Sequence, residues 1–165
     1  MGTSYSRPEA RPGYLNIRKI LALKDQPRNL LRLLQLYGVI GREGEVRCPE
    51  KKCGAIMTLK FTESYGKWPD GVYWRCNNKF KNNNKKFVNC DRTQSIRVGT
   101  FFHKSHLNII QIMIFVHLWC KHVEIGVAAE EADISSSRTA ADWNSFCREV
   151  VLDHCFSKST KIGKK

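Results

Sequence analysis

Four cysteines are the residues of this sequence best suited to metal chemistry. Cys48 and Cys53 lie in the stretch "CPEKKCG", and Cys76 and Cys90 follow farther along the chain. Two thiolates about two to four residues apart can turn around one tetrahedral Zn²⁺, and a structural zinc site takes four ligands. Gly54, directly after the second cysteine, suits a tight turn with a positive φ. The sequence therefore predicts one structural zinc ion held by Cys48, Cys53, Cys76 and Cys90.

The second cysteine pair departs from the usual spacing. Cys76 and Cys90 enclose the segment "NNKFKNNNKKFVN" instead of a short knuckle. Loop closure disfavours added length only weakly, by about 0.6 kcal/mol per doubling, so an insertion that projects into solvent is compatible with a metal site. Two alternatives stay open. The pair could be ordinary buried thiols, or His103 or His106 could replace Cys90 as the fourth ligand.

The remaining cysteines are expected to pack as small apolar side chains on helices. They are Cys120, Cys147 and Cys155, and unpaired cysteine behaves as a small hydrophobe. His117, Cys120 and His122 have partly helical spacing, but a second metal site is disfavoured because no further ligand lies nearby in the sequence. The chain begins without an apolar segment that would act as a secretory signal, so we expect an intracellular protein with metal-bound or buried thiols, not disulfides.

The charge of the chain indicates a polyanionic partner. The net charge is +13 and the pI is about 9.6. A domain this basic points first to nucleic acid. Residues 48–105 hold twelve Lys or Arg and four acidic residues, whereas residues 106–155 hold three basic and seven acidic residues. The cationic field is therefore expected on the cysteine-rich part and the chain ends.

Two segments supply candidate contacts to DNA. Lysines of the insertion can neutralise phosphates without reading sequence, and Ser, Thr, Asn and Arg can contact phosphates or base edges. Phe80 and Phe87 could stack on an unpaired base if they are exposed. The alternatives are a solvated loop and a merely packed helical hairpin. The candidates are Lys79, Lys81, Lys85, Lys86, Arg92, Arg97, Ser136, Ser137, Arg138, Thr139 and Asn144.

The N-terminal part is expected to form one supporting helix. Residues 1–13 are polar and predict a disordered basic arm. Residues 14–41 predict an amphipathic helical segment, with Asp25 as N-cap, Pro27 in the first turn, and Gly38 or Gly41 at the end.

Short strands are expected to position the cysteines. "AIMTLKFT" (55–62), "GVYWRC" (71–76) and "QSIRVGTFF" (94–102) have strand character. Residues 42–104 are therefore predicted to form a small antiparallel zinc ribbon with a basic insertion loop.

Helices are expected to follow. Residues 105–155 predict a helix-turn-helix unit: a first apolar helix capped by Ser105, the short helix "VAAEEAD", a turn, and a last helix capped by a serine among 135–137. Residues 156–165 predict a basic tail or linker. The longest apolar run, "LNIIQIMIFVHLWC", is shorter than the roughly 20 residues that span a bilayer. The fold class is therefore α+β, with no membrane partner.

The order of these parts resembles the N-terminal region of Merlin-type transposases. The match covers roughly residues 25–163. Its most specific part is Ser95-x-Arg97-x-Gly99-Thr100-x-Phe102-x-x-Ser105, followed by an apolar helix ending in Trp119.

The resemblance implies a DNA-binding function without catalysis. In that family the catalytic carboxylates lie in a following RNase-H-like domain, where they hold two divalent metals. Asp133, Asp142 and Asp153 fall in the helical hairpin, where no strand or metal loop would present them together. We therefore expect a nuclear, zinc-dependent module that binds duplex DNA such as transposon terminal inverted repeats, and no small-molecule substrate. A homo-oligomer stays open, as do a transposase fragment, a truncated copy or a host protein. The alternative functions are a protein-interaction adaptor and a single-stranded nucleic-acid binder.

Overall fold

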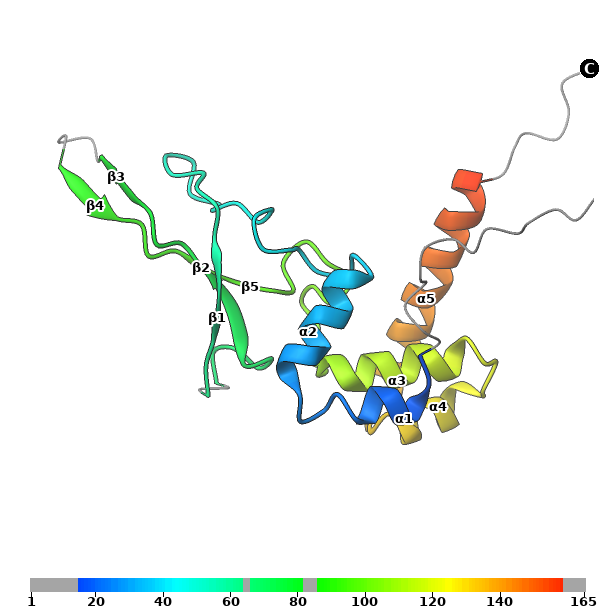
Figure 1. Cartoon of the computed structure of the whole chain (residues 1–165). Helices are drawn as coiled ribbons and strands as arrows, with labels where there is room; N and C mark the ends of the chain where they lie inside the picture. The colour runs from blue at the N-terminus through cyan, green and yellow to red at the C-terminus, as the bar shows by residue number, and fades with distance from the viewer. Residues whose placement is uncertain (1–14, 64–65, 82–85, 159–165) are drawn as a thin grey trace, which may run out of the picture. The chain divides into compact units, whose positions relative to one another are not determined.

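The computed structural model describes residues 15–63, 66–81 and 86–158 of the chain (Figure 1). The predicted arm (1–13), Lys85 and residues 159–165 of the predicted tail lie outside the described residues. The chain divides into two compact units, and unit 1 includes Ala22–Asn108. Unit 2 comprises Asn16–Leu21 and the chain from Ile109 onward. A small antiparallel sheet and several helices make the chain α+β, as the sequence predicts.

The sheet of unit 1 has three antiparallel strands in the order β1-β2-β5. They are β1 (Thr58–Phe61), β2 (Val72–Arg75) and β5 (Thr93–Ser95). Val72 and Trp74 of the central strand are buried, so one face of the sheet forms the core of this unit. The prediction of a strand over 94–102 is wrong beyond Ser95, because the chain turns repeatedly from 96 to 104 and Gly99 takes a φ of +74°.

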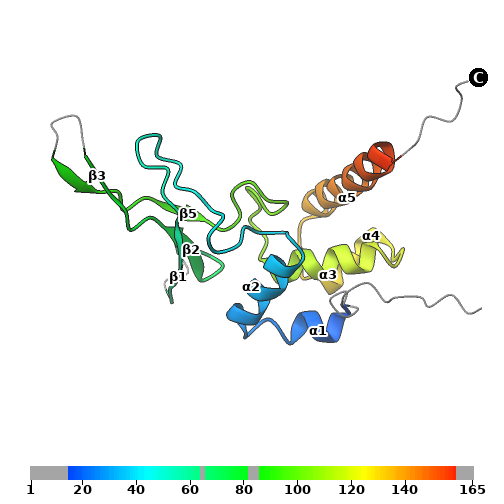
Figure 2. The same cartoon turned by 45° about the horizontal axis from the view of Figure 1, so that its top comes forward.

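The insertion is a two-stranded β-ribbon and not the loop that the sequence predicts. β3 (Lys79–Lys81) pairs antiparallel with β4 (Phe87–Asn89). In the β2–β5 pair, Arg75 lies opposite Thr93. Lys79, four residues after Arg75, lies opposite Asn89, which is four residues before Thr93. The β2–β5 pair and the β3–β4 pair therefore share one register. β3 and β4 therefore prolong the β2–β5 hairpin, as Figure 2 shows.

The helix expected between Asp25 and Gly38 is present, and a separate short helix precedes it; the two helices belong to different units. α1 (Ile17–Leu21) is part of unit 2, and α2 (Pro27–Leu36) is part of unit 1. Gln26, and not Asp25, occupies the N-cap position of α2, without a side-chain cap bond. Proline disfavours a helical conformation in the residue before it, which accounts for the start of α2 at Pro27. Gly38 ends α2 with a φ of +69°, in agreement with the prediction.

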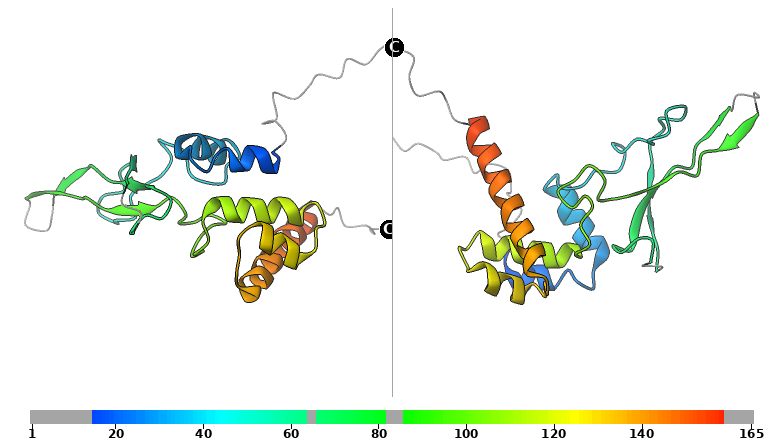
Figure 3. Two further views of the ribbon diagram at one scale, coloured as in Figure 1. Left: turned by 90° about the horizontal axis from the view of Figure 1, so that it is seen from below. Right: turned by 180° about the vertical axis from the view of Figure 1, so that it is seen from behind.

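The regular elements of unit 2 among its described residues are all helices (Figure 3). α3 (Ile109–Trp119) packs against α1, α4 (Ile125–Glu131) and α5 (Ser137–Lys158). Ser105 does not cap α3, which begins four residues later; its Oγ accepts from the backbone N–H of Leu107 in a local turn. In the described part of the chain, α3 and the other helices are each too short or too polar to cross a membrane.

The core of unit 2 is made of apolar side chains from all four of its helices. Ile20 of α1 and Phe115 of α3 are fully buried, and Ala128 of α4 is nearly so. α5 contributes Trp143 and Cys147 to the same core. Only the first part of α5 is covered in this way, because the described side chains after Cys147 are exposed.

Candidate metal centre

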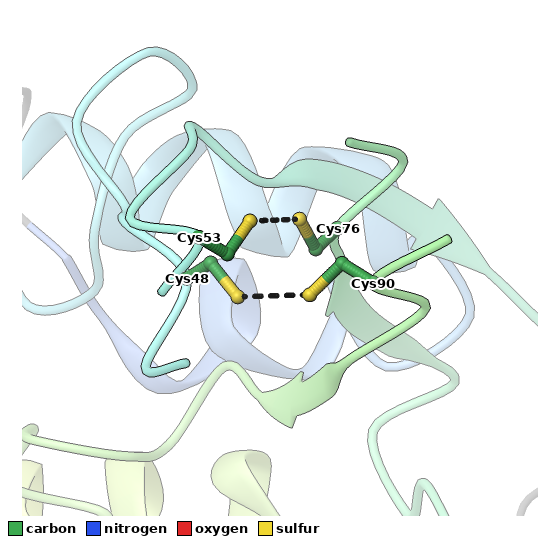
Figure 4. Close-up of side chains that lie close together, drawn as sticks. All are labelled: Cys48, Cys53, Cys76 and Cys90. Atoms are coloured by element: carbon green, nitrogen blue, oxygen red, sulfur yellow. Dashed lines mark hydrogen bonds between the residues drawn. The ribbon is translucent and has the colours of Figure 1, made fainter. Parts of the chain in front are cut away.

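The sulfur atoms of the four predicted zinc ligands lie together (Figure 4). The Sγ atoms of Cys48 and Cys90 are 3.5 Å apart, as are those of Cys53 and Cys76, and all four lie within 4.8 Å of one another. A tetrahedral zinc ion with Zn–S bonds of about 2.3 Å places its sulfur atoms about 3.8 Å apart. A disulfide would need about 2.05 Å, and all four thiols are free. The cluster therefore has the composition and size of a structural zinc site.

The first two cysteines are held by a tight knuckle. The backbone N–H of Cys53 donates to the carbonyl of Glu50 at 2.9 Å, and the N–H of Cys48 donates to the carbonyl of Ala55 at 2.8 Å. Gly54 has a φ of +56° and donates to the same Glu50 carbonyl. A residue with a Cβ atom is strained at such a φ. The Gly54 conformation therefore turns the chain so that both thiols face one point.

The other two cysteines lie where the β2–β5 pair continues into the ribbon. The N–H of Cys76 donates to the carbonyl of Arg92 at 2.8 Å, and the N–H of Cys90 donates to the carbonyl of Asn78 at 2.9 Å. In this register Cys76 lies opposite Arg92, two residues after Cys90. Alternate residues of a strand share a face, so both cysteines point to the same side of the hairpin. Asp91, with a φ of +47°, interrupts the regular ladder at this level.

Polar contacts around the thiols join the knuckle to the hairpin. The side-chain amide of Asn78 donates to the Sγ of Cys53 at 3.4 Å, and Arg92 forms an ion pair with Glu50 at 3.0 Å. The Asn78 amide, together with a backbone N–H bond, lowers the pKa of Cys53 to about 7. Hydrogen bonds of this kind orient metal ligands and adjust their basicity.

The thiols of the cluster have different proton affinities before metal binds. Burial raises the pKa of Cys76 to about 12, and burial also raises the pKa of Cys48. A thiolate, and not a thiol, is the form that binds a metal. Metal binding must therefore displace protons from the buried cysteines.

The other metal alternatives do not assemble among the described residues. The four-cysteine cluster is the one group of potential ligands found there, so His103 and His106 are not part of it. His117, Cys120 and His122 do not converge either. Of the three remaining cysteines that were expected to be buried, only Cys147 is buried. Its burial raises the pKa of the thiol to about 11. Cys120 and Cys155 are exposed, because one follows the end of α3 and the other lies on the uncovered part of α5.

The lysines of the insertion lie on the ribbon. Lys79, Lys81 and Lys86 are exposed, while Lys85 lies outside the described residues. Arg92 is also exposed but is engaged with Glu50 in the ion pair beside the cysteines.

Arg97, predicted as a DNA contact, is a structural residue. Its side chain is 7% exposed and forms a bidentate ion pair with Asp70, at 2.7 and 2.5 Å. Its Nη1 donates to the backbone carbonyls of Ser105 and Leu107. The guanidinium is therefore satisfied within unit 1 and has no surface for phosphate. Its role is to hold the 96–107 segment against the turn before β2.

The candidates on unit 2 gather at the start of α5. Ser136, Ser137 and Arg138 are exposed there, and the Oγ of Ser136 accepts from the backbone N–H of Thr139, which confirms a serine cap. Asn144 is half-buried, and its side-chain oxygen accepts from the indole N–H of Trp119 at 2.8 Å. That contact uses Asn144 for packing α3 against α5.

The sequence analysis did not single out an aromatic group beside the sheet. Trp68 stacks on Tyr73, with ring centroids 4.8 Å apart and planes 11° apart. The ammonium of Lys67 lies 5.0 Å from the centre of the Trp68 ring. Tyr73 lies opposite Lys60 in the register of β1 and β2. The strand-like alternation of "GVYWRC" would have placed Tyr73 away from the core and was the available signal.

Comparison with known proteins gave no match to a family model, to a curated protein or to a solved structure.

Proposed function

We propose that this chain is a zinc-dependent DNA-binding module, of the type that precedes the catalytic domain in Merlin-type transposases. The observation that carries the proposal is the position of the four thiols at the base of a lysine-bearing β-ribbon. In this proposal unit 1 is a zinc ribbon and unit 2 a helix-turn-helix. The module binds duplex DNA such as terminal inverted repeats in the nucleus, and it performs no catalysis itself.

Zinc would act as a staple between the knuckle and the hairpin. The sheet of unit 1 has only short strands, and so small a core rarely holds a fold without a metal or a disulfide. Cys48 and Cys53 come from the knuckle, whereas Cys76 and Cys90 come from the hairpin, so one ion joins both parts. The ion would fix the direction in which the ribbon leaves the sheet.

The ribbon has a shape and a charge that suit DNA. A two-stranded β-ribbon fits a groove of duplex DNA, and proteins of several families place strands in the major or the minor groove. Three arginines of unit 1 are already paired with acids: Arg75 with Asp91, Arg92 with Glu50, and Arg97 with Asp70. These three acids are therefore compensated by arginines of the unit, and we assign the exposed Lys79 and Lys81 of the ribbon to phosphate contacts.

The start of α5 offers a second contact. In helix-turn-helix proteins the N-terminal residues of the second helix reach base edges in the major groove. Ser137 and Arg138 occupy this position on α5. Glu130 and Asp133 lie close by in the sequence and are exposed, so they weaken the local attraction for phosphate. The ribbon is therefore proposed as the main source of affinity and α5 as a reader of sequence.

Selection of the full chain on a randomised duplex library tests the function. We expect submicromolar binding that weakens steeply with salt and is lost when zinc is removed by a chelator. A Cys120→Ser variant, changed outside the cluster, should bind like the wild type. Undetectable binding to the library at low salt would refute the proposed function. A protein–DNA complex that survives removal of zinc would refute the proposed structural role of the metal.

One observation favours an adaptor as the second candidate. The C-terminal half of α5 exposes Leu152 and Phe156, which are four residues apart and share one face of the helix, and Phe156 is 74% exposed. An apolar surface of this kind is typical of a protein-interaction site. Crosslinking in nuclear extract with and without nuclease separates the two functions, since an adaptor keeps its partners after nuclease treatment. Competition between single-stranded and duplex oligonucleotides tests the single-stranded alternative.

A further inference from the structure

The outer face of the sheet and one face of the ribbon form a single surface. Within unit 1, the side-chain amide of Asn77 donates to the Oγ1 of Thr58 on β1 at 2.9 Å. Arg75 reaches Asp91 at 3.0 Å on the same side of the hairpin. Because alternate side chains of a strand point to the same face, Lys79 lies on this side as well. The opposite side carries the cysteines, as the contact of Asn78 with the Cys53 sulfur shows.

This outer face carries cations and aromatic rings at both of its ends. Tyr73 lies at the sheet end, opposite Lys60. Lys81 and Phe87 lie opposite one another on the ribbon, at the end farthest from the cysteines. Nine residues from Tyr73 to Lys81 span about 26 Å in an extended strand, at roughly 3.3 Å per residue. That length corresponds to about eight base pairs of duplex at 3.4 Å each.

Phe87 is the aromatic residue that the ribbon contributes to this face, and its side chain is highly exposed. It is 69% exposed, and the ammonium of Lys81 lies 5.2 Å from the centre of its ring. Phe80, by contrast, is half-buried and lies opposite Val88 on the other face. The packing of the ribbon therefore does not account for the position of the Phe87 ring. A ring held beside lysines is suited to a ligand that has both phosphates and stacked bases.

We infer that Phe87 is a wedge that inserts between adjacent base pairs of the bound duplex, while Lys79 and Lys81 contact the flanking phosphates. The inference rests on the proposed DNA-binding function and adds to it that the DNA is deformed. Proteins that insert an apolar side chain between base steps unstack the step and kink the duplex. The kink brings more of the backbone to the protein, here toward the cationic outer face.

A duplex from the library selection, with 2-aminopurine placed at successive positions, tests the wedge. The zinc-loaded wild type should raise the 2-aminopurine fluorescence several-fold at one step. The same complex should bring dyes on the two DNA ends closer together, as measured by energy transfer. Phe87→Ala should abolish both signals, whereas Phe80→Ala, changed on the opposite face, should retain them. Equal zinc content in all three proteins shows that the fold is kept.

The outcomes separate this inference from the function on which it rests. Wild-type binding without a fluorescence rise or a bend refutes the wedge and leaves DNA binding intact. A rise that persists in Phe87→Ala also refutes it, as does a rise confined to single-stranded or overhanging probes. No binding of the wild type to any duplex refutes the proposed function itself.

Discussion

Replacing the ribbon with a two-residue turn should separate DNA binding from metal binding. The variant exchanges residues 79–89 for Asn-Gly, so that Asn78 and Cys90 become the closing pair of the hairpin. Asn-Gly favours the turn type that joins two antiparallel strands directly. The backbone bond from Cys90 to Asn78 and the Cys76–Arg92 bond lie below the deletion. The variant should therefore bind zinc as the wild type does.

The expected loss of DNA affinity follows from the lysines removed. The deleted segment contains four: Lys79, Lys81, Lys85 and Lys86. Each phosphate contact contributes about 0.9 to the slope of log K against log salt, so the slope should fall by up to about 3.6. Raising salt fourfold, from about 50 to 200 mM, weakens binding about 3.5-fold per contact. The wild type should lose roughly 150-fold more affinity over this range than the variant.

Fluorescence anisotropy across a salt series, with metal analysis of the same samples, measures both quantities. A second variant with the four lysines changed to Gln keeps the ribbon and removes only its charge. It should show the same reduced slope, together with full zinc content. An unchanged slope in either variant would refute the ribbon as the phosphate contact. Loss of zinc from the shortened variant would show that Cys76 and Cys90 are not placed by the strand register that β2–β5 and β3–β4 share.

Three further predictions concern the metal site and the core. Cys90→Ser should lower zinc retention measured by metal analysis, whereas Cys120→Ser should not, and equal retention would remove Cys90 from the site. Arg97→Met leaves the carboxylate of Asp70 buried and unpaired, so the free energy of unfolding should fall by about 3–5 kcal/mol; a change below 1 kcal/mol in a urea titration would contradict a structural role for Arg97. Zinc affinity should fall as pH falls, because the raised pKa of Cys76 and of the second buried thiol keeps both protonated in the metal-free protein near pH 7. At least two protons leave on binding, so affinity should change about 100-fold per pH unit, and calorimetry in buffers of different ionisation enthalpy counts them.

The first cysteine pair of the cluster could be predicted because its signal is local and chemical. The spacing of Cys48 and Cys53, with Gly54 behind them, specifies a knuckle without reference to the rest of the fold. The serine cap of α5 and the glycine that ends α2 are local in the same sense. Features of this type depend on a few neighbouring backbone bonds, which the residue types identify.

The ribbon could not be predicted from its own residues. Asn and Lys are depleted in strands, and the segment between Cys76 and Cys90 is composed mainly of these two residues. Its strands form because β2 and β5 already pair in the register that β3 and β4 continue. That pairing joins residues about twenty positions apart.

Arg97 shows the same limit for a single residue. In the sequence, an arginine in a basic segment favours phosphate contact. In the structure it meets Asp70, a residue separated from it by β2, the ribbon and β5. The burial of the pair depends on tertiary structure, so residue type alone assigned Arg97 to the wrong surface.

The shared register also explains how Cys76 and Cys90 can be separated by thirteen residues and still bring their thiols into one cluster. A one-residue shift between paired strands would turn one cysteine to the opposite face. Lengthening both strands equally leaves the face unchanged, because side chains alternate with a period of two. The ribbon adds the same number of residues to each strand, so Cys76 and Cys90 stay on the side of the knuckle. The ribbon and two of the four clustered cysteines therefore belong to one hairpin. In the proposed function the metal would position the ribbon, and the ribbon would not be needed to hold the metal.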